Sequence, residues 1–250
     1  MAEMLGKIEV LDDPLRLASY VAEWMTQAAL SSSGDFRVAL SGGSTPKTLY
    51  TLLAAPEFKD RFPWSRVLWF WGDERFVPQD HPDSNYKMTR DAMLAQAPVP
   101  PENIFPVPVD GDPDMAAARY AETLQKIYGA TILDPSRPLF DIVLLGLGPD
   151  GHTASLLPGE PVLNERKKWV ACVPHGRDEV RITLTYPALE SARRVAFLVA
   201  GKEKAKIFKE IRTGQSLVPA AQIRPTGELF WFVDRAVVEE NVTSHKNLQA

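Results

Sequence analysis

Residues 37–53 read RVALSGGSTPKTLYTLL, and this stretch decides the class of fold. It begins with a short apolar run, Arg37–Leu40, passes through the glycine-rich turn Ser41–Pro46 and continues into a helical candidate, Pro46–Leu53. A strand that leads through a tight turn into a helix is the first half of a βαβ unit.

The same alternation of apolar runs and longer amphipathic segments recurs along the rest of the chain. Several runs are apolar at consecutive positions, which is typical of strands covered on both faces in a parallel sheet. The pattern predicts an α/β fold, Rossmann-like, with a doubly wound, mostly parallel sheet and helices on both faces. The predicted strands are Lys7–Val10, Arg37–Leu40, Val67–Trp71, Phe140–Leu147, Trp169–Val173, Arg181–Thr185, Val195–Ala200 and Leu229–Val233. The predicted helices are Leu15–Leu30, Pro46–Leu53, Asn85–Ala95, Asp114–Tyr128 and Lys202–Thr213.

The connections between these segments indicate the domain organisation. Proline is concentrated in Ala97–Pro101, Pro106–Pro113 and Asp134–Pro138. None of these runs has the length expected of an interdomain linker, and the sequence contains no internal repeat. We expect residues 1–250 to form a single α/β domain, and the sequence leaves open a small subdomain after residue 150.

Composition and charge exclude several classes of protein. Of the 250 residues, 45% are hydrophobic and 24% are charged, so collagen-like, coiled-coil and largely disordered chains are excluded. The net charge is −4, from 28 basic and 32 acidic residues, and no basic block stands out. Nucleic acid and an anionic membrane surface are therefore not expected partners.

Cysteine usage and the N-terminal residues bear on the compartment. Cys172 is the only cysteine, which excludes an internal disulfide and a cysteine metal cluster. The N-terminus, MAEMLGKIEVLDD, has acidic residues where a signal peptide has a basic and then an apolar run. No apolar stretch approaches the ~18 residues of a membrane span, and no His, Asp and Glu have metal-ligand spacing. The sequence predicts a soluble, cytoplasmic protein without metal or cofactor.

The turn after the predicted strand Arg37–Leu40 is a candidate phosphate site. Its residues are Ser41, Gly42, Gly43, Ser44 and Thr45, followed by Pro46. Glycine lets the backbone approach a ligand closely, and we expect Thr45 to cap the next helix with Pro46 in its first position. Free N–H and hydroxyl donors at a helix N-terminus attract phosphate. Pro46 excludes a Walker A loop, and an ordinary strand–helix turn is a strong alternative for this segment alone.

Three consecutive charged residues, Asp73, Glu74 and Arg75, follow the strand Val67–Trp71. Ligands of α/β sheets bind in the crevice at the carboxyl ends of the strands, so these side chains are candidates for a site. A solvated, salt-bridged turn fits the same residues equally well. Downstream, Ser84 is expected to cap a helix.

Residues 146–155, GLGPDGHTAS, follow the most hydrophobic run in the chain. They contain G-x-G-x-x-G, the fingerprint of a dinucleotide-binding turn. However, Pro149-Asp150 fills the turn where the backbone would have to approach a pyrophosphate closely. The next predicted strand, Trp169–Val173, also has no acidic residue to bind a ribose. We therefore reject a dinucleotide site. The turn presents His152 near the carboxylate of Asp150, which suits a general base. The alternative is a histidine that only ties the turn together.

Two basic residues are further candidates for phosphate binding. Arg181 begins the predicted strand Arg181–Thr185, and Lys202 follows the strand Val195–Ala200. Arginine favours bidentate contacts with phosphate and lysine a point-charge contact. Without the other segments, both would be interpreted as surface cations.

Taken together, these segments resemble the 6-phosphogluconolactonases, within the superfamily that also holds the glucosamine-6-phosphate deaminases. The resemblance runs over nearly the whole chain and implies a glucosamine-6-phosphate deaminase-like fold. Leu157 stands where the family usually has Phe before Pro-Gly, which affects no catalytic position. The resemblance is carried by Ser41–Pro46, Gly72–Arg75, Ser84-Asn85, Gly146–Ser155, Leu156-Leu157-Pro158-Gly159, Arg181 and Lys202.

Two positions separate this chain from the deaminases. They have Tyr after their Asp-Glu pair, where this chain has Arg75. Five residues after the histidine of Asp-Gly-His they place a carboxylate that assists ring opening, and here that position is Leu157. Asp73 matches the carboxylate that deaminases use as a base, so it does not discriminate.

The resemblance implies hydrolysis of 6-phosphoglucono-δ-lactone to 6-phosphogluconate in the oxidative pentose phosphate pathway. His152 is expected to take a proton from water, Asp150 to support the imidazole and Arg75 to stabilise the oxyanion, while a part for Asp73 stays open. A glucosamine-6-phosphate deaminase/isomerase and a non-catalytic sugar-phosphate sensor are the alternatives. The phosphate is expected to bind Ser41, Gly42, Gly43, Ser44, Thr45, Arg181 and Lys202.

Overall fold

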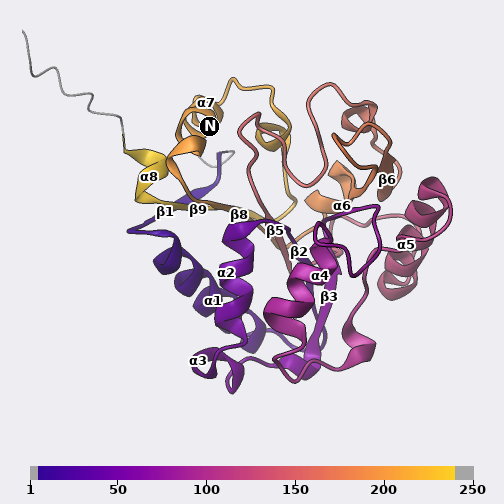
Figure 1. The fold of residues 1–250 in the computed structure, drawn as a ribbon, viewed down its shortest axis with the longest axis horizontal. Coiled ribbons are helices and arrows are strands. Elements are labelled where there is room, and N and C mark those ends of the chain that lie inside the picture. The colour runs from indigo at the N-terminus through magenta and orange to yellow at the C-terminus, as the bar shows by residue number, and fades with distance from the viewer. Residues whose placement is uncertain (1–4, 240–250) are drawn as a thin grey trace, which may run out of the picture.

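The computed structural model describes residues 5–239, and this part of the chain contains nine strands (Figure 1). The strands are β1 (Lys7–Leu11), β2 (Phe36–Leu40), β3 (Val67–Trp71), β4 (Asp73–Arg75), β5 (Ile142–Leu145), β6 (Val170–Val173), β7 (Arg181–Leu184), β8 (Arg194–Val199) and β9 (Glu228–Asp234). All eight predicted strands are confirmed, and β4 is an addition.

Six strands form a parallel sheet in the order β1-β9-β8-β5-β2-β3. The chain runs from β2 outward to β3 on one side and later returns to β5 on the other side of β2, so the order reverses at β2. In sheets of this kind ligands bind at such a switch point, outside the carboxyl ends of the strands. The turn after β2 and the turn after β5 therefore face one another there.

The remaining strands form a small antiparallel sheet in the order β4-β7-β6. The sequence predicted β6 and β7 as strands but did not separate them from the main sheet. It also interpreted residues 73–75 as a charged strand end, although they pair with β7. Three charged residues carry no strand pattern of their own, so only the pairing with β7 identifies β4.

Helices cover both faces of the parallel sheet, as predicted. Trp24 on α1 (Pro14–Leu30) packs edge-on against Phe230 and Phe232 of β9. Trp231, which points to the opposite face, packs against Phe208 on α7 (Ala205–Arg212). In Figure 1, α1 and α2 lie side by side below the sheet and α7 lies above it. The helices are α1 (Pro14–Leu30), α2 (Ser44–Leu53), α3 (Pro56–Lys59), α4 (Asn85–Thr89), α5 (Pro113–Tyr128), α6 (Tyr186–Glu190), α7 (Ala205–Arg212) and α8 (Arg235–Val238).

Helix boundaries differ from the prediction by more than one residue at three places. The predicted helix Asn85–Ala95 is α4 followed by a π-helical turn, Arg90–Leu94. The predicted helix Lys202–Thr213 is a 3₁₀ turn, Lys202–Lys204, followed by α7. α2 begins at Ser44, so the expectation that Thr45 caps this helix is wrong.

Candidate active site

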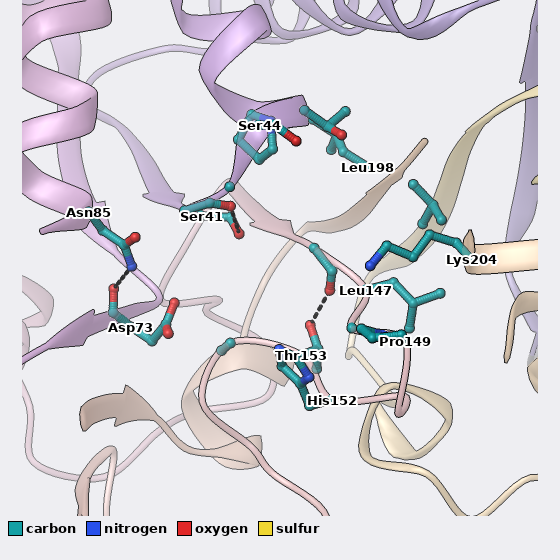
Figure 2. Close-up of a pocket in the computed structure, with 18 of the residues that line it drawn as sticks. Ser41, Ser44, Asp73, Asn85, Leu147, Pro149, His152, Thr153, Leu198 and Lys204 are labelled. Carbon is teal, nitrogen blue, oxygen red and sulfur yellow. Dashed lines mark hydrogen bonds between the residues drawn. The ribbon is translucent and has the colours of Figure 1, made fainter. Parts of the chain in front are cut away.

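A cavity of about 270 Å³ lies at the carboxyl ends of β2 and β5, beside the small antiparallel sheet (Figure 2). It brings together Ser41 to Thr45, Asp73, Arg75, His152 and Arg181, which are nine of the eleven predicted site residues. The other two, Asp150 and Lys202, are not among the lining residues, although Asp150 contacts His152. The lining comprises residues 41–46, Asp73, Arg75, Asn85, residues 146–149, residues 152–154, Arg181, residues 198–200, Glu203 and Lys204.

The turn after β2 presents backbone donors to the cavity. Gly43 is the N-cap of α2 with φ of 105°, a left-handed conformation that favours glycine, and it has no side chain to cap the helix. The first N–H groups of α2 are therefore open to an anion. The buried Tyr50 hydroxyl holds the turn, since it accepts from Ser41 N at 3.0 Å and donates to Ser41 O at 2.8 Å.

Gly42 allows the turn to meet a second segment of the site. A Cβ at this position would lie 2.0 Å from Oδ1 of the buried Asn85. Asn85 in turn donates from Nδ2 to the backbone oxygen of Asp73 at 3.0 Å, as the dashed line in Figure 2 shows. The glycine thus lets α2, α4 and β4 converge on one side of the cavity.

His152 and Asp150 form a close pair on the turn after β5. Nδ1 of His152 lies 2.5 Å from Oδ1 of Asp150. A carboxylate partner places the proton on Nδ1, which leaves Nε2 as the ring nitrogen that can accept a proton. Desolvation raises the pKa of Asp150, but hydrogen bonds from His152 and the charges of His152 and Arg177 lower it to about 2. Asp150 is therefore a carboxylate at neutral pH.

The glycines of this turn make room for the chain's own side chains. A Cβ on Gly148 would lie 1.9 Å from Nδ1 of His152, and a Cβ on Gly151 would lie 2.4 Å from Cβ of Val218. Thr153 closes the turn by donating from Oγ1 to the backbone oxygen of Gly146 at 2.8 Å (Figure 2). This packing supports the rejection of a dinucleotide site, because the space beside Gly148 is filled by the imidazole.

Asp73 faces the cavity and is buried, with 6% of its surface exposed. The buried Ser155 donates from Oγ to Oδ2 of Asp73 at 2.6 Å. Ala154, just before it, has φ of 46°, which costs an L-residue conformational energy. No local pattern in the sequence assigns a role to Ser155, because its partner is distant in sequence.

Glu74 points away from the cavity and joins β4 to the start of α4. Its carboxylate accepts from the backbone N of Arg75 at 2.8 Å, of Asn85 at 2.7 Å and of Tyr86 at 2.7 Å, and from Ser84 Oγ at 3.2 Å. Burial raises the pKa of Glu74 to about 7, although the three backbone donors oppose this rise. The side chain fixes the segment that carries Asp73 and Arg75.

Cationic side chains reach the cavity from two places. Arg75 donates from Nη1 to the backbone oxygen of Asp83 at 2.6 Å, and the buried Arg181 donates from Nε to that of Gly176 at 2.6 Å. Lys204 lines the cavity (Figure 2), whereas Lys202 is exposed and outside the lining. In a 3₁₀ turn of three residues per turn, residues two apart point in different directions, so Lys204 stands where Lys202 was expected.

Two features are absent from the described residues. Within residues 5–239, no group of three or more His, Cys, Asp or Glu side chains is arranged to hold a metal ion. In the same range, no helix has the length and apolar character needed to cross a membrane.

Comparison with known proteins identifies the family. The model of the family described as glucosamine-6-phosphate isomerases/6-phosphogluconolactonase matches residues 13–231. The chain is 39% identical to a 6-phosphogluconolactonase of Nostoc sp. over 95% of this chain and 99% of the relative. The structure of a Trypanosoma cruzi 6-phosphogluconolactonase superposes with a TM-score of 0.82 at 30% identity, over 95% of this chain and 97% of that one.

A monomeric glucosamine-6-phosphate deaminase also superposes, with a TM-score of 0.78 over 92% of this chain and 98% of that one. At 18% identity this likeness shows the fold alone. The fold is therefore the one that lactonases and deaminases share, and the predicted deaminase-like architecture is confirmed. The chain belongs to the glucosamine-6-phosphate isomerase/6-phosphogluconolactonase family.

Proposed function

We propose that this chain is a 6-phosphogluconolactonase, which hydrolyses 6-phosphoglucono-δ-lactone to 6-phosphogluconate in the oxidative pentose phosphate pathway. The observation that carries the proposal is the His152–Asp150 pair, 2.5 Å apart, at a cavity that also holds cationic side chains and the N-terminus of α2. One part of this cavity suits a phosphate and the other a proton transfer. The identity to lactonases over nearly the whole chain supports the same reaction.

In the proposed reaction His152 is the general base. Its Nε2 takes a proton from a water molecule whose oxygen forms a bond to the carbonyl carbon, while the carbonyl electron pair moves onto oxygen. Arg75 stabilises the resulting oxyanion. When this intermediate collapses, the bond from the carbon to the ring oxygen breaks, and the ring oxygen takes the proton from His152. The product carboxylic acid then releases a proton to solvent.

The phosphate group is proposed to bind opposite the base. Its partners are the donors of residues Ser41 to Thr45 with Arg181 and Lys204, the last in place of Lys202, which lies outside the cavity. Asp150 keeps the imidazole oriented, and the buried Asp73 completes the wall beside Arg75. No step in this scheme uses a metal ion or a cofactor.

The deaminase alternative would need a proton-transferring side chain at position 157, and this chain has none there. Leu157 is buried and does not line the cavity, so no proton-transferring side chain stands where deaminases assist ring opening. Asp73 is suitably placed in either enzyme and does not decide between them. A non-catalytic sensor would keep the phosphate site without needing the His152–Asp150 pair.

The test is a direct comparison of substrates. The purified protein is incubated separately with 6-phosphoglucono-δ-lactone and with glucosamine 6-phosphate, and acid release from the lactone is measured above uncatalysed hydrolysis. We expect lactone turnover and no ammonia from the amino sugar. Ammonia release would support the deaminase, and binding without any turnover would support the sensor.

We also propose that the enzyme works in the cytoplasm. A chain with one cysteine forms no internal disulfide, so nothing in it requires an oxidising compartment. Cell fractionation followed by detection of the native protein tests this location, and recovery with membranes or in the secreted fraction would contradict it.

A further inference from the structure

Arg177 stands beside the proposed base although no sequence pattern pointed to it. It lies on the turn between β6 and β7, and its Nη2 donates to Oδ2 of Asp150 at 2.8 Å. The same nitrogen is 3.1 Å from Nδ1 of His152. Each carboxylate oxygen of Asp150 thus has its own partner: Oδ1 contacts the imidazole of His152 and Oδ2 accepts from the guanidinium of Arg177.

The backbone of Arg177 is held in an unfavourable conformation. Its φ is 82°, and within residues 5–239 only one other non-glycine residue, Ala154, has a positive φ. Such a conformation is unfavourable for an L-residue and persists only where the surroundings impose it. Both residues of this kind lie next to the proposed catalytic groups.

Arg181 anchors the turn that carries Arg177. Its Nε donates to the backbone oxygen of Gly176 at 2.6 Å, and a Cβ on Gly176 would lie 2.7 Å from Cγ of Arg181. Nη2 of Arg181 is also 3.5 Å from the carboxylate of Glu179. One short turn therefore connects a proposed phosphate ligand to the pair that performs the proton transfer.

The charge of Arg177 opposes that of Asp150 at the imidazole. A carboxylate beside an imidazole favours its protonated form, and a cation at the same distance disfavours it. Since only the neutral form accepts a proton from water, a nearby cation keeps the base in its active form at lower pH. The other charged side chains that line the cavity with His152 are Asp73, Arg75, Arg181, Glu203 and Lys204. The turn that carries Arg177 also contains His175, Asp178 and Glu179.

We propose that Arg177 is a positioning residue of this site, which holds Asp150 against His152 and favours the neutral imidazole. The proposal rests on the proposed lactone hydrolysis, because it assigns His152 as the base. This role accounts for the unfavourable backbone conformation of Arg177, because the positive φ directs the guanidinium onto Asp150 rather than into solvent.

Two variants and one control separate this role from a merely structural one. Arg177→Gly removes the guanidinium and adopts the positive φ without strain, so its thermal stability should equal or exceed that of the wild type. Arg177→Lys keeps the charge but loses the planar donor geometry. Arg119→Ala is the matched control, because Arg119 on α5 also pairs with an aspartate, Asp110, at 3.0 Å on the surface away from the cavity.

The primary readout is the pH profile of kcat/KM, measured together with the Kd for 6-phosphogluconate. In Arg177→Gly we expect the acid limb to move to higher pH by up to roughly one unit, with a several-fold lower kcat at pH 7 and an unchanged Kd. Arg177→Lys should restore most of the shift in the acid limb, and Arg119→Ala should match the wild type. An Arg177→Gly profile that superposes on the wild-type profile would overturn the proposal.

A second readout does not depend on activity. The imidazole signal of His152, assigned with His152→Asn, is followed by NMR during a pH titration of the wild type and of Arg177→Gly. We expect the titration midpoint of the variant to lie above that of the wild type, and equal midpoints would also overturn the proposal. If the wild type hydrolyses no lactone but the midpoints differ, the proposed function fails while the role of Arg177 at His152 stands.

Discussion

Arg75 on β4 and Arg181 on β7 lie directly opposite each other in the small antiparallel sheet. Directly opposite residues of an antiparallel pair project from the same face, so both guanidinium groups reach the cavity. Like charges in this arrangement repel, and a bound anion relieves the repulsion. The pairing of two short strands thus places two guanidinium groups at one side of the cavity, an arrangement that suits the proposed anionic substrate.

The first prediction concerns the oxyanion. Arg75→Ala should lower kcat by about 10²–10³-fold, the loss typical of removing one oxyanion donor, because the charge develops only in the transition state. The Kd for 6-phosphogluconate should change much less. Steady-state kinetics together with calorimetric titration of the product checks this, and a normal kcat with weakened binding would make Arg75 a ligand contact instead.

The second prediction separates two lysines that lie two residues apart in sequence. Lys204→Ala removes the proposed charge-assisted contact with phosphate. Such a contact is worth about 1.5–3 kcal/mol, so KM should rise by about 10–150-fold with kcat nearly unchanged. Lys202→Ala is the matched control, because Lys202 is exposed outside the lining and its loss should leave KM near the wild-type value. The opposite ranking would return the phosphate contact to Lys202. Equal wild-type turnover of phosphorylated and unphosphorylated gluconolactone would contradict a phosphate site altogether.

The third prediction tests the room that Gly148 leaves for the base. In Gly148→Ala the new Cβ would lie 1.9 Å from Nδ1 of His152 and 2.7 Å from Oδ1 of Asp150, so the pair must move. A displacement of about 1 Å at a catalytic group costs about 10²-fold, and kcat should fall on that scale. Gly146→Ala, whose Cβ meets only Ser41 Oγ at 3.7 Å, should lose much less. Equal losses in the two variants would mean that the proximity of Gly148 to His152 is irrelevant.

The fourth prediction concerns pH and stability at Glu74. Because burial raises the pKa of Glu74 from 4.5 to about 7, the folded state holds a proton in this window that the unfolded state has lost. Stability therefore falls as pH rises from about 4.5 to about 7, by up to about 3 kcal/mol from this group. In Glu74→Gln this contribution is absent, so the stability difference, wild type minus variant, should shrink as pH rises.

Thermal unfolding of both proteins between pH 4.5 and pH 8 measures this difference. The variant should be the less stable protein at pH 5, since an amide NH₂ in place of Oε2 faces the N–H of Tyr86 and leaves it without an acceptor. A stability difference that grows with pH would show that the donors around Glu74 outweigh its burial.

The parallel sheet could be predicted from the sequence because its strands are apolar at consecutive positions. Val67–Trp71 is buried at every position, and β2 pairs with it from Phe36 opposite Val67 to Leu40 opposite Trp71. The antiparallel sheet could not be predicted, because β4 consists of three charged residues whose strand character comes only from β7. The pattern of apolar residues in a segment indicates whether its side chains are buried. Which strands pair with one another is decided by the tertiary fold.

Site residues on turns next to strand ends could be predicted from the sequence. Site residues that depend on contacts between distant segments could not. Glycine next to a strand end indicated the turns that carry Ser44 and His152. The contacts of Ser155 with Asp73 and of Arg177 with Asp150 join segments distant in sequence, and no local pattern indicates them. Lys202 directly follows a strand and was therefore chosen, but the 3₁₀ turn that begins there brings Lys204 to the cavity instead.

The most direct test of the account pairs kcat for the lactone with the Kd for 6-phosphogluconate, in the wild type and in His152→Ala. A general base contributes about 10²–10⁴ in rate, so kcat should fall on that scale. The Kd should stay near the wild-type value, because the phosphate contacts lie on other segments. His152→Asn, which fills more of the space but cannot accept the proton, should lose as much activity. A folded His152→Ala protein with near-normal kcat would contradict the assignment of His152 as the base.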